Sequence, residues 1–264
     1  MLQGMKTLIM SAPNGARKTK ADHPQLPMNI AETVQEAQKA HQAGAAILHA
    51  HVRDIDGHHT LDHGLYRELL GEIARHVPTM PCQITTEAVG KFSVEEQFNC
   101  LIQTQPQYAS IAIREITSEG IDLAARTYHA ARDQGTHVQH ILYDLEDLAL
   151  LRKLVKQGHL NTENPDILYV LGKYNPDFRS HPDELDPFLA QDLTFANSWM
   201  VCAFGPHEYD IMVKAAENGG HARIGFENNL YLKEGTLAPD NAALIKQFAA
   251  HADIIDDVTT VFSR

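Results

Sequence analysis

The chain has 264 residues, of which 34 are aspartate or glutamate and 22 are lysine or arginine, so its formal charge is -12. Because binding to a phosphate backbone requires a surplus of basic residues, this balance argues against a nucleic-acid-binding protein. Hydrophobic residues make up 44% of the chain and charged residues 21%, a composition that is ordinary for globular proteins. We expect one domain over residues 1–264, since barrels of alternating strands and helices reach about 250 residues as one unit.

The cysteine pattern and the absence of a targeting pattern bear on location. Cys82, Cys100 and Cys202 are scattered and form neither a CxxC pair nor an even-numbered framework, which favours a reducing compartment. The sequence has no secretory-signal pattern and no apolar run near the roughly 18 residues that a membrane-spanning helix needs. We therefore expect a cytoplasmic protein with no membrane partner.

Short apolar runs alternate along the chain with longer amphipathic stretches, which is typical of parallel βα units. The expected strands cover residues 8–11, 46–52, 83–86, 108–113, 137–143, 167–171, 199–204 and 222–226. The expected helices cover residues 30–42, 64–75, 93–103, 120–133, 145–156, 182–189, 207–217 and 241–250. This order predicts an α/β fold, a (β/α)8 TIM barrel. A doubly wound open sheet is the alternative, but no GxGxxG motif follows the first strand.

The end of the second expected strand carries two histidines. Barrel active sites lie at the carboxyl ends of the strands, and His49 and His51 share a face there because they are two residues apart. With 16 histidines in the chain, about one His-x-His is expected by chance, so the pattern alone fits two ordinary buried histidines. Its position after an apolar run favours metal ligation, because buried imidazoles need polar partners.

A carboxylate from another strand end would complete such a site, since catalytic zinc commonly has three protein ligands and one open position. Glu227 lies at the end of the eighth expected strand, and Arg223 precedes it by four residues on the same face. A lone glutamate there is more often a helix cap or a surface residue, but beside the histidine pair ligation is favoured.

The other histidines are left outside the site. His58, His59 and His63 fall in a polar loop and are expected to be hydrated, whereas His23 and His140 could approach the pocket.

Three segments resemble the β-keto acid cleavage enzymes. Residues 12–24 read APNGARKTKADHP, residues 43–53 read AGAAILHAHVR, and residues 219–229 read GGHARIGFENN. The resemblance implies a TIM barrel, a Zn²⁺ ion and acetyl-CoA as co-substrate in a homotetrameric acyltransferase. The implied reaction converts a 3-keto acid and acetyl-CoA into acetoacetate and the acyl-CoA of the remainder.

The resemblance also assigns residues. It places the zinc ligands on His49, His51 and Glu227, and the active-site arginine on Arg223. It places the contact with the distal group of the substrate on Arg17, where an arginine prefers an acceptor or an anion. A hydrated loop arginine is the alternative for Arg17.

Several positions depart from the family pattern. Asn228 stands where family members usually have aspartate, so a carboxylate implicated in activating the reaction is replaced by an amide. Thr85 and Thr86 keep the hydroxyl groups of a carboxylate-binding segment, but Glu87 follows them and would repel an anion. After the sixth strand, Lys173 and the residues behind it replace the usual glycines. The predicted substrate-binding residues are therefore Arg17, Thr85, Thr86 and Asn228.

These departures leave alternatives open. One is another zinc-barrel reaction, a hydrolysis or an aldol-type cleavage with the same three ligands. Another is a catalytically silent barrel that binds a metal or a small acid. Within the family reaction, Glu87 or a metal-bound water would have to manage the proton that the missing aspartate would take.

Overall fold

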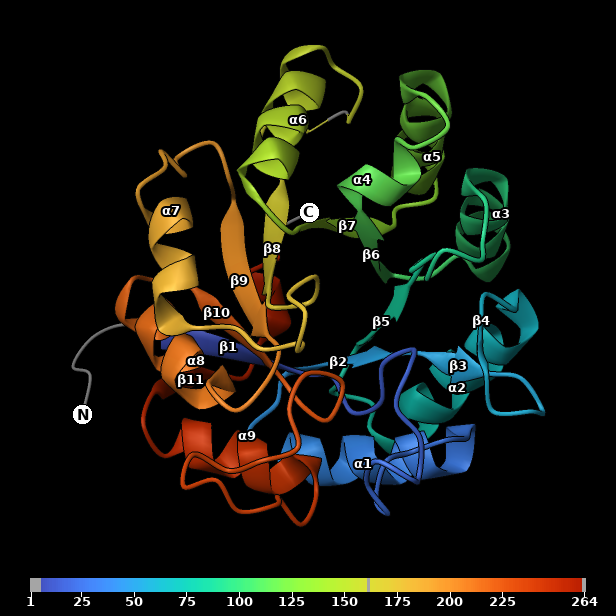
Figure 1. The fold of residues 1–264 in the computed structure, drawn as a ribbon. Coiled ribbons are helices and arrows are strands. Elements are labelled where there is room, and N and C mark those ends of the chain that lie inside the picture. The colour runs from blue at the N-terminus through green and yellow to red at the C-terminus, as the bar shows by residue number, and fades with distance from the viewer. Residues whose placement is uncertain (1–5, 161, 263–264) are drawn as a thin grey trace.

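Eight parallel strands close into a barrel in the computed structural model, which describes residues 6–160 and 162–262 (Figure 1). The barrel strands are β1 (Lys6–Ser11), β2 (Ile47–Ala50), β5 (Cys82–Thr85), β6 (Tyr108–Ala112), β7 (His137–Leu142), β8 (Asp166–Leu171), β9 (Ser198–Ala203) and β10 (His221–Ile224). β10 pairs with β1 and closes the ring. The predicted TIM barrel is confirmed, and the ends of the predicted domain, residues 1 and 264, lie outside the described residues.

Helices surround the barrel on its outer side (Figure 1). The longer ones are α1 (Ile30–Gln42), α2 (His63–His76), α3 (Val94–Thr104), α5 (Ile121–Asp133), α6 (Leu145–Lys156), α8 (Glu208–Glu217) and α9 (Asn241–Ala249). Shorter turns are α4 (Ile113–Ile116), η1 (Pro182–Leu185) and α7 (Asp186–Leu189), so the helix expected over 182–189 is divided. Side-chain caps set several starts: Asn29 accepts from the amide of Glu32, and Ser93 with Glu96 forms a capping box.

Two strands end two residues earlier than the apolar runs in the sequence predict. After β2 the chain leaves the barrel, and β3 (Val52–Arg53) pairs with β4 (His59–Thr60) in a small antiparallel hairpin. β10 stops before Gly225, whose φ is 152°, and a Cβ there would lie 2.3 Å from the carbonyl oxygen of Ala12. Only glycine fits this turn. The turn lets the amide of Glu227 donate to the same Ala12 oxygen at 3.0 Å and places Glu227 over the barrel end.

The apolar core has two layers, one between strands and helices and one inside the barrel. The inner layer includes Leu8 and Met200 and also Val258, Val261 and Phe262 from the end of the described chain. There β11 (Asp253–Ile255) pairs with the start of β1, and η2 (Val258–Thr260) follows. The amino-terminal end of the barrel is thus covered by apolar side chains, which leaves polar chemistry to the opposite end.

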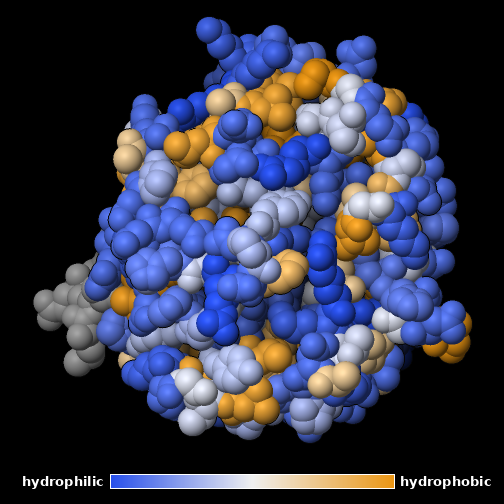
Figure 2. Space-filling view, in the orientation of Figure 1, coloured by the Kyte–Doolittle hydropathy of each residue, from blue (hydrophilic) through white to orange (hydrophobic). Residues whose placement is uncertain are grey.

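The molecular surface is consistent with the acidic, polar sequence. Hydrophilic residues cover most of the face seen in Figure 2, and hydrophobic atoms form separate patches on it. Within residues 6–160 and 162–262, no helix has both the length and the apolar character needed to cross a bilayer.

Two buried histidines away from the carboxyl end of the barrel predict acid lability. His140 packs against the Tyr128 ring of α5 and not in the pocket, and the Nδ1 of His221 accepts from the amide of Leu8 at 3.2 Å. Burial lowers the pKa of each imidazole to about 4. In the unfolded chain these pKa values return to about 6.5, so the unfolded state binds protons first. Stability should fall as the pH drops from 6.5 towards 4, by about 2 kcal/mol per histidine between pH 7 and pH 5.

Denaturant unfolding of the metal-free protein at pH 7 and pH 5 measures this loss. His140→Leu removes one of the two groups and should reduce the loss by about 2 kcal/mol. His58→Leu, at an exposed histidine, controls for the loss of one imidazole. An unchanged pH dependence in His140→Leu would contradict the assignment.

Candidate active site

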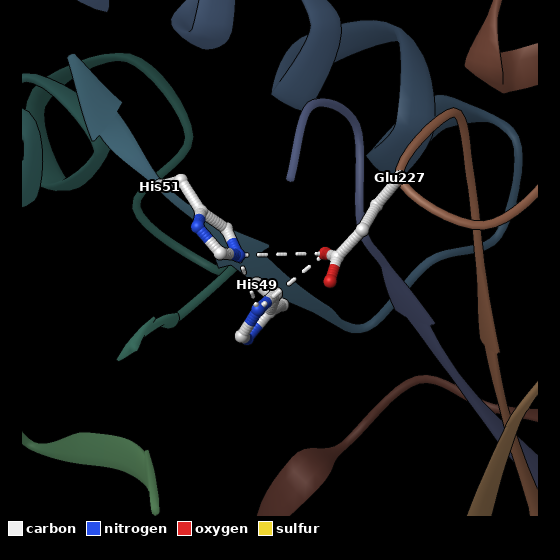
Figure 3. Close-up of side chains that lie close together, drawn as sticks. All are labelled: His49, His51 and Glu227. Carbon is white, nitrogen blue, oxygen red and sulfur yellow. Dashed lines mark hydrogen bonds and ion pairs between the residues drawn. The ribbon is translucent and has the colours of Figure 1, made fainter. Parts of the chain in front are cut away.

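His49, His51 and Glu227 point towards one another at the carboxyl end of the barrel (Figure 3). The Nε2 atoms of the two histidines are 3.3 Å apart. The Oε2 of Glu227 lies 3.5 Å from the Nε2 of His49 and 3.7 Å from the Nε2 of His51. Three ligands bound to one zinc at 2.0–2.1 Å and tetrahedral angles would be about 3.3 Å apart. The Oε2 atom is buried and has no hydrogen-bond partner among the described residues. The donor set and its spacing therefore fit a tetrahedral divalent ion.

The protonation of His49 is set by a glutamine behind it. Its Nδ1 lies 2.8 Å from the Oε1 of Gln83, whose amide nitrogen in turn donates to Gln139 at 3.1 Å. Because a carbonyl oxygen only accepts, Nδ1 carries the proton and Nε2 keeps its lone pair. Burial and the nearby charge of Arg223 lower the pKa of His49 to about 3. His49 is therefore a neutral imidazole with its free nitrogen facing Glu227.

A second histidine, His59, determines which ring nitrogen of His51 donates a hydrogen bond. The Nε2 of His59 lies 3.0 Å from the backbone oxygen of Glu87 and must donate to it, so Nδ1 of His59 accepts. The Nδ1 of His51, 3.4 Å away, is then the donor, and in the neutral form of the ring its Nε2 is the nitrogen with a lone pair for a metal ion. The expectation that His59 is hydrated is wrong, because the β3–β4 hairpin buries it behind His51. Burial, with His51 nearby, lowers the pKa of His59 to about 4.

Glu227 is held ionised and in place by its neighbours. The Nη2 of Arg223 donates to its Oε1 at 3.1 Å and also to the sulfur of Cys202 at 3.1 Å. Although burial alone would raise it, the positive charge of Arg223 holds the pKa of Glu227 well below its usual range. Gly15 lies against Glu227, where a Cβ would come within 2.5 Å of its Cγ. Arg53 fixes this loop by donating to the Gly15 oxygen at 2.7 Å.

Two spaces open at this site. A cavity of about 510 Å³ is lined by Arg17, Asn228 and Glu227, among others. A much smaller space beside the proposed ligands is lined by Thr85 and Arg223. Thr86 is buried and lines neither, because its hydroxyl donates to the Ser110 oxygen at 3.3 Å. The structure thus brings most of the predicted site residues to one chamber, with Thr86 behind its wall.

Comparison with known proteins identifies the family. The sequence profile of the beta-keto acid cleavage enzymes matches residues 6–259. The chain belongs to this family. The 3-keto-5-aminohexanoate cleavage enzyme of Acetoanaerobium sticklandii is 27% identical over 249 residues, which cover 92% of this chain and 90% of that protein. The 3-oxoadipate:acetyl-CoA acetyltransferase of Cupriavidus necator is 26% identical over 262 residues, which cover 92% of this chain and 87% of that protein.

A solved structure supports the same fold. The ternary complex of ObcA with a C4-CoA adduct and oxalate superposes with a TM-score of 0.70 at 14% identity, over 91% of this chain and 68% of that chain. The family resemblance predicted from the sequence motifs is confirmed by the profile match, and the protein is an enzyme of the β-keto acid cleavage family.

In this β-keto acid cleavage enzyme, the surroundings of Asn228 explain why an amide stands there. Its Nδ2 donates to the Arg223 carbonyl at 2.9 Å and to the Oε1 of Glu208 at 3.2 Å, and its Oδ1 accepts from Cys202 at 3.0 Å. Burial raises the pKa of Glu208 to about 8. An aspartate would replace the hydrogen bond donated to the Arg223 carbonyl by a contact between two acceptors, and a buried acceptor without a donor is costly. The amide is therefore matched to its pocket.

Lys173 is a site residue that the sequence did not reveal. It follows β8, and its ammonium contacts the Oε1 of Glu87, 86 residues earlier in the chain. Although burial would lower it, the charge of Glu87 raises the pKa of Lys173. The expected repulsion of anions by Glu87 is thus offset by a cation at contact distance. The sequence marks Lys173 only as a departure from the usual glycines of the family, because its pairing with Glu87 depends on the closed barrel.

Proposed function

We propose that this β-keto acid cleavage enzyme converts a 3-keto acid and acetyl-CoA into acetoacetate and an acyl-CoA, with Zn²⁺ held by His49, His51 and Glu227. The observation that carries the proposal is the set of three buried donor atoms, 3.3 to 3.7 Å apart, beside a cavity of about 510 Å³. A bound zinc ion would supply Lewis acidity towards a carbonyl oxygen. The name of the Cupriavidus necator relative, which includes 3-oxoadipate and acetyl-CoA, supports the substrate class.

The other site residues receive roles from their contacts. Arg223 is buried, and its Nε has no hydrogen-bond partner among the described residues, so it can donate to an oxyanion that develops beside the ligands. Thr85 and Asn228 form parts of the substrate wall, and Thr86 supports that wall through its bond to Ser110. Asn228 cannot take the proton from the carbon between the keto and carboxylate groups of the 3-keto acid, because a neutral amide is no base at ordinary pH.

The experiment that tests the function is a panel of 3-keto acids, incubated with and without acetyl-CoA and assayed for acetoacetate. We expect acetoacetate only when acetyl-CoA is present. Consumption of a keto acid without acetyl-CoA would favour hydrolysis or an aldol-type cleavage. A protein that binds zinc and is stabilised by keto acids, but turns none over, would be a silent binding barrel.

The positive charge of Arg17 leads us to expect a preference among the 3-keto acids of the panel. Its side chain is exposed at the wide cavity and lies over the Phe178 ring, with Cζ 5.7 Å from the centroid. A substrate with a distal carboxylate, such as 3-oxoadipate, should therefore react faster than one with a distal ammonium. Arg17→Glu should lower kcat/KM for the carboxylate by about 10- to 100-fold, since a charge-assisted hydrogen bond contributes about 1.5–3 kcal/mol.

Lys20→Glu is the matched control, because it makes the same charge reversal in the same loop without lining the cavity. An equal effect of Arg17→Glu on substrates with carboxylate and ammonium ends would contradict a role in recognising the distal group.

A further inference from the structure

Lys173 and Glu87 form a buried ion pair where the two spaces of the site meet. Their side chains are 10% and 8% exposed. Both residues line the large cavity and the small space beside His49 and His51. The second carboxylate oxygen of Glu87 lies 3.9 Å from the Nδ1 of His51. The ammonium of Lys173 is therefore part of the chamber wall next to the proposed metal ligands.

The backbone donors at the end of β5 are already occupied. An anionic group bound here would need hydrogen-bond donors, and backbone amides after a strand are common ones. The amide of Glu87 donates to the hydroxyl of Thr85 at 3.0 Å. The amide of Ala88 donates to the carboxylate of Glu115 at 2.9 Å. An external carboxylate at Ala88 would have to displace one that the protein supplies itself.

Lys173 has donors to spare. An ammonium has three, and within the described residues its hydrogen-bond partner is Glu87. The ring of Tyr143 flanks the ammonium, with its centroid 5.6 Å from Nζ. The Nη2 group of Arg223, by contrast, is already shared between Glu227 and Cys202. Lys173 is thus a cation in the chamber that can accept a further anionic partner.

We propose that Lys173 binds the carboxylate of the 3-keto acid beside the metal centre, and that Glu87 is the residue that positions it. This inference rests on the proposed function, because it presumes a keto acid in the chamber. Glu87 holds the flexible lysine side chain in place before the substrate arrives, which lowers the entropy cost of binding. It also keeps the buried ammonium paired when no substrate is bound.

The test compares binding of acetoacetate and its neutral methyl ester to the zinc-loaded protein by calorimetry, without acetyl-CoA. The double variant Lys173→Met with Glu87→Gln removes one charge of each sign, so the net charge of the site is unchanged. We expect it to weaken acetoacetate binding by about 10- to 100-fold, as for a lost charge-assisted hydrogen bond, and to leave the ester within about threefold. Glu87→Gln alone should weaken acetoacetate binding by only about threefold, since the cation remains and the amide oxygen of glutamine still accepts from it but holds it less firmly.

Lys214→Met is the matched control, because Lys214 is ion-paired with Asp186 and 25% exposed but lines neither space. If the double variant does not fold or load zinc, the pair Lys173→Gln with Glu87→Gln, whose amides can bond to each other, should show the same loss. Undiminished acetoacetate binding in the double variant, or an equal loss in Glu87→Gln alone, would overturn the proposal.

Turnover with acetyl-CoA is measured separately from binding. Acetoacetate binding that depends on Lys173, in a protein without turnover on any keto acid, would overturn the proposed function and leave the carboxylate site standing. Normal turnover with binding that is indifferent to Lys173 would do the reverse.

Discussion

Replacing His49 with alanine should reduce bound zinc from stoichiometric to a small fraction and lower kcat/KM by at least about 1,000-fold. Changes to residues behind a metal ligand alone lower metal affinity or activity by about 10- to 100-fold, so loss of a ligand should cost more. His49 is buried and contributes one of the three donor atoms of the centre. Metal analysis of the purified variant, together with an acetoacetate assay, measures both effects.

Two further variants test whether zinc is bound by His49 and its neighbours or elsewhere. Gln83→Leu removes the acceptor that orients His49, and it should weaken zinc binding by about 10- to 100-fold. His58→Ala tests a second group of potential ligands within residues 6–160 and 162–262, the half-buried Asp54 with the exposed Asp56 and His58. Full zinc in His49→Ala with loss in His58→Ala would assign the metal to that loop and refute the barrel site.

The sequence was sufficient for the barrel and for the shared position of His49 and His51, because both depend on local periodicity. Alternating apolar runs define the strands, and residues two apart on a strand share a face wherever the strand lies. His49 and His51 keep this relation even though β2 ends at Ala50, between them. Glu227 could be placed at a strand end for the same reason, although the turn at Gly225 that aims it was not foreseen.

The partners of these residues could not be predicted, because they come from non-local packing. His59 contacts His51 only because β3 and β4 pair in a hairpin. The short strands of this hairpin have no strong apolar pattern that would predict them. Gln83 meets His49 through the register of β2 and β5. Lys173 meets Glu87 across the barrel mouth. Each is a polar residue whose role depends on which strand lies beside it.

The chain is acidic, yet the chamber collects positive charge. Arg223 and Lys173 are buried there, and the ammonium of Lys18 donates to the backbone oxygen of Glu227 at 2.6 Å. Burial lowers the pKa of Lys18. Anionic substrates would thus meet several cations in the chamber, two of them paired with Glu87 and Glu227, in a chain whose formal charge is -12.

Arg223→Met should separate chemistry from metal binding. Arg223 donates to Glu227 and leaves its buried Nε for a developing oxyanion, and removal of one such donor lowers kcat by about 100- to 1,000-fold. Zinc should remain bound, because all three ligands stay and Glu227 loses a cation that competes for its charge. The metal-free variant should unfold more easily, since Glu227 is then a buried carboxylate without its partner.

The matched control for Arg223→Met is Arg114→Met, because Arg114 pairs with Asp144 and Asp147 but lines neither space of the site. Kinetics, metal analysis and unfolding with and without zinc give the three readouts. Loss of zinc as complete as in His49→Ala would mean that Arg223 acts by holding Glu227. Unchanged kcat with bound zinc would mean that the charge developing in the reaction is stabilised elsewhere, and Lys173 would then be the cation to examine.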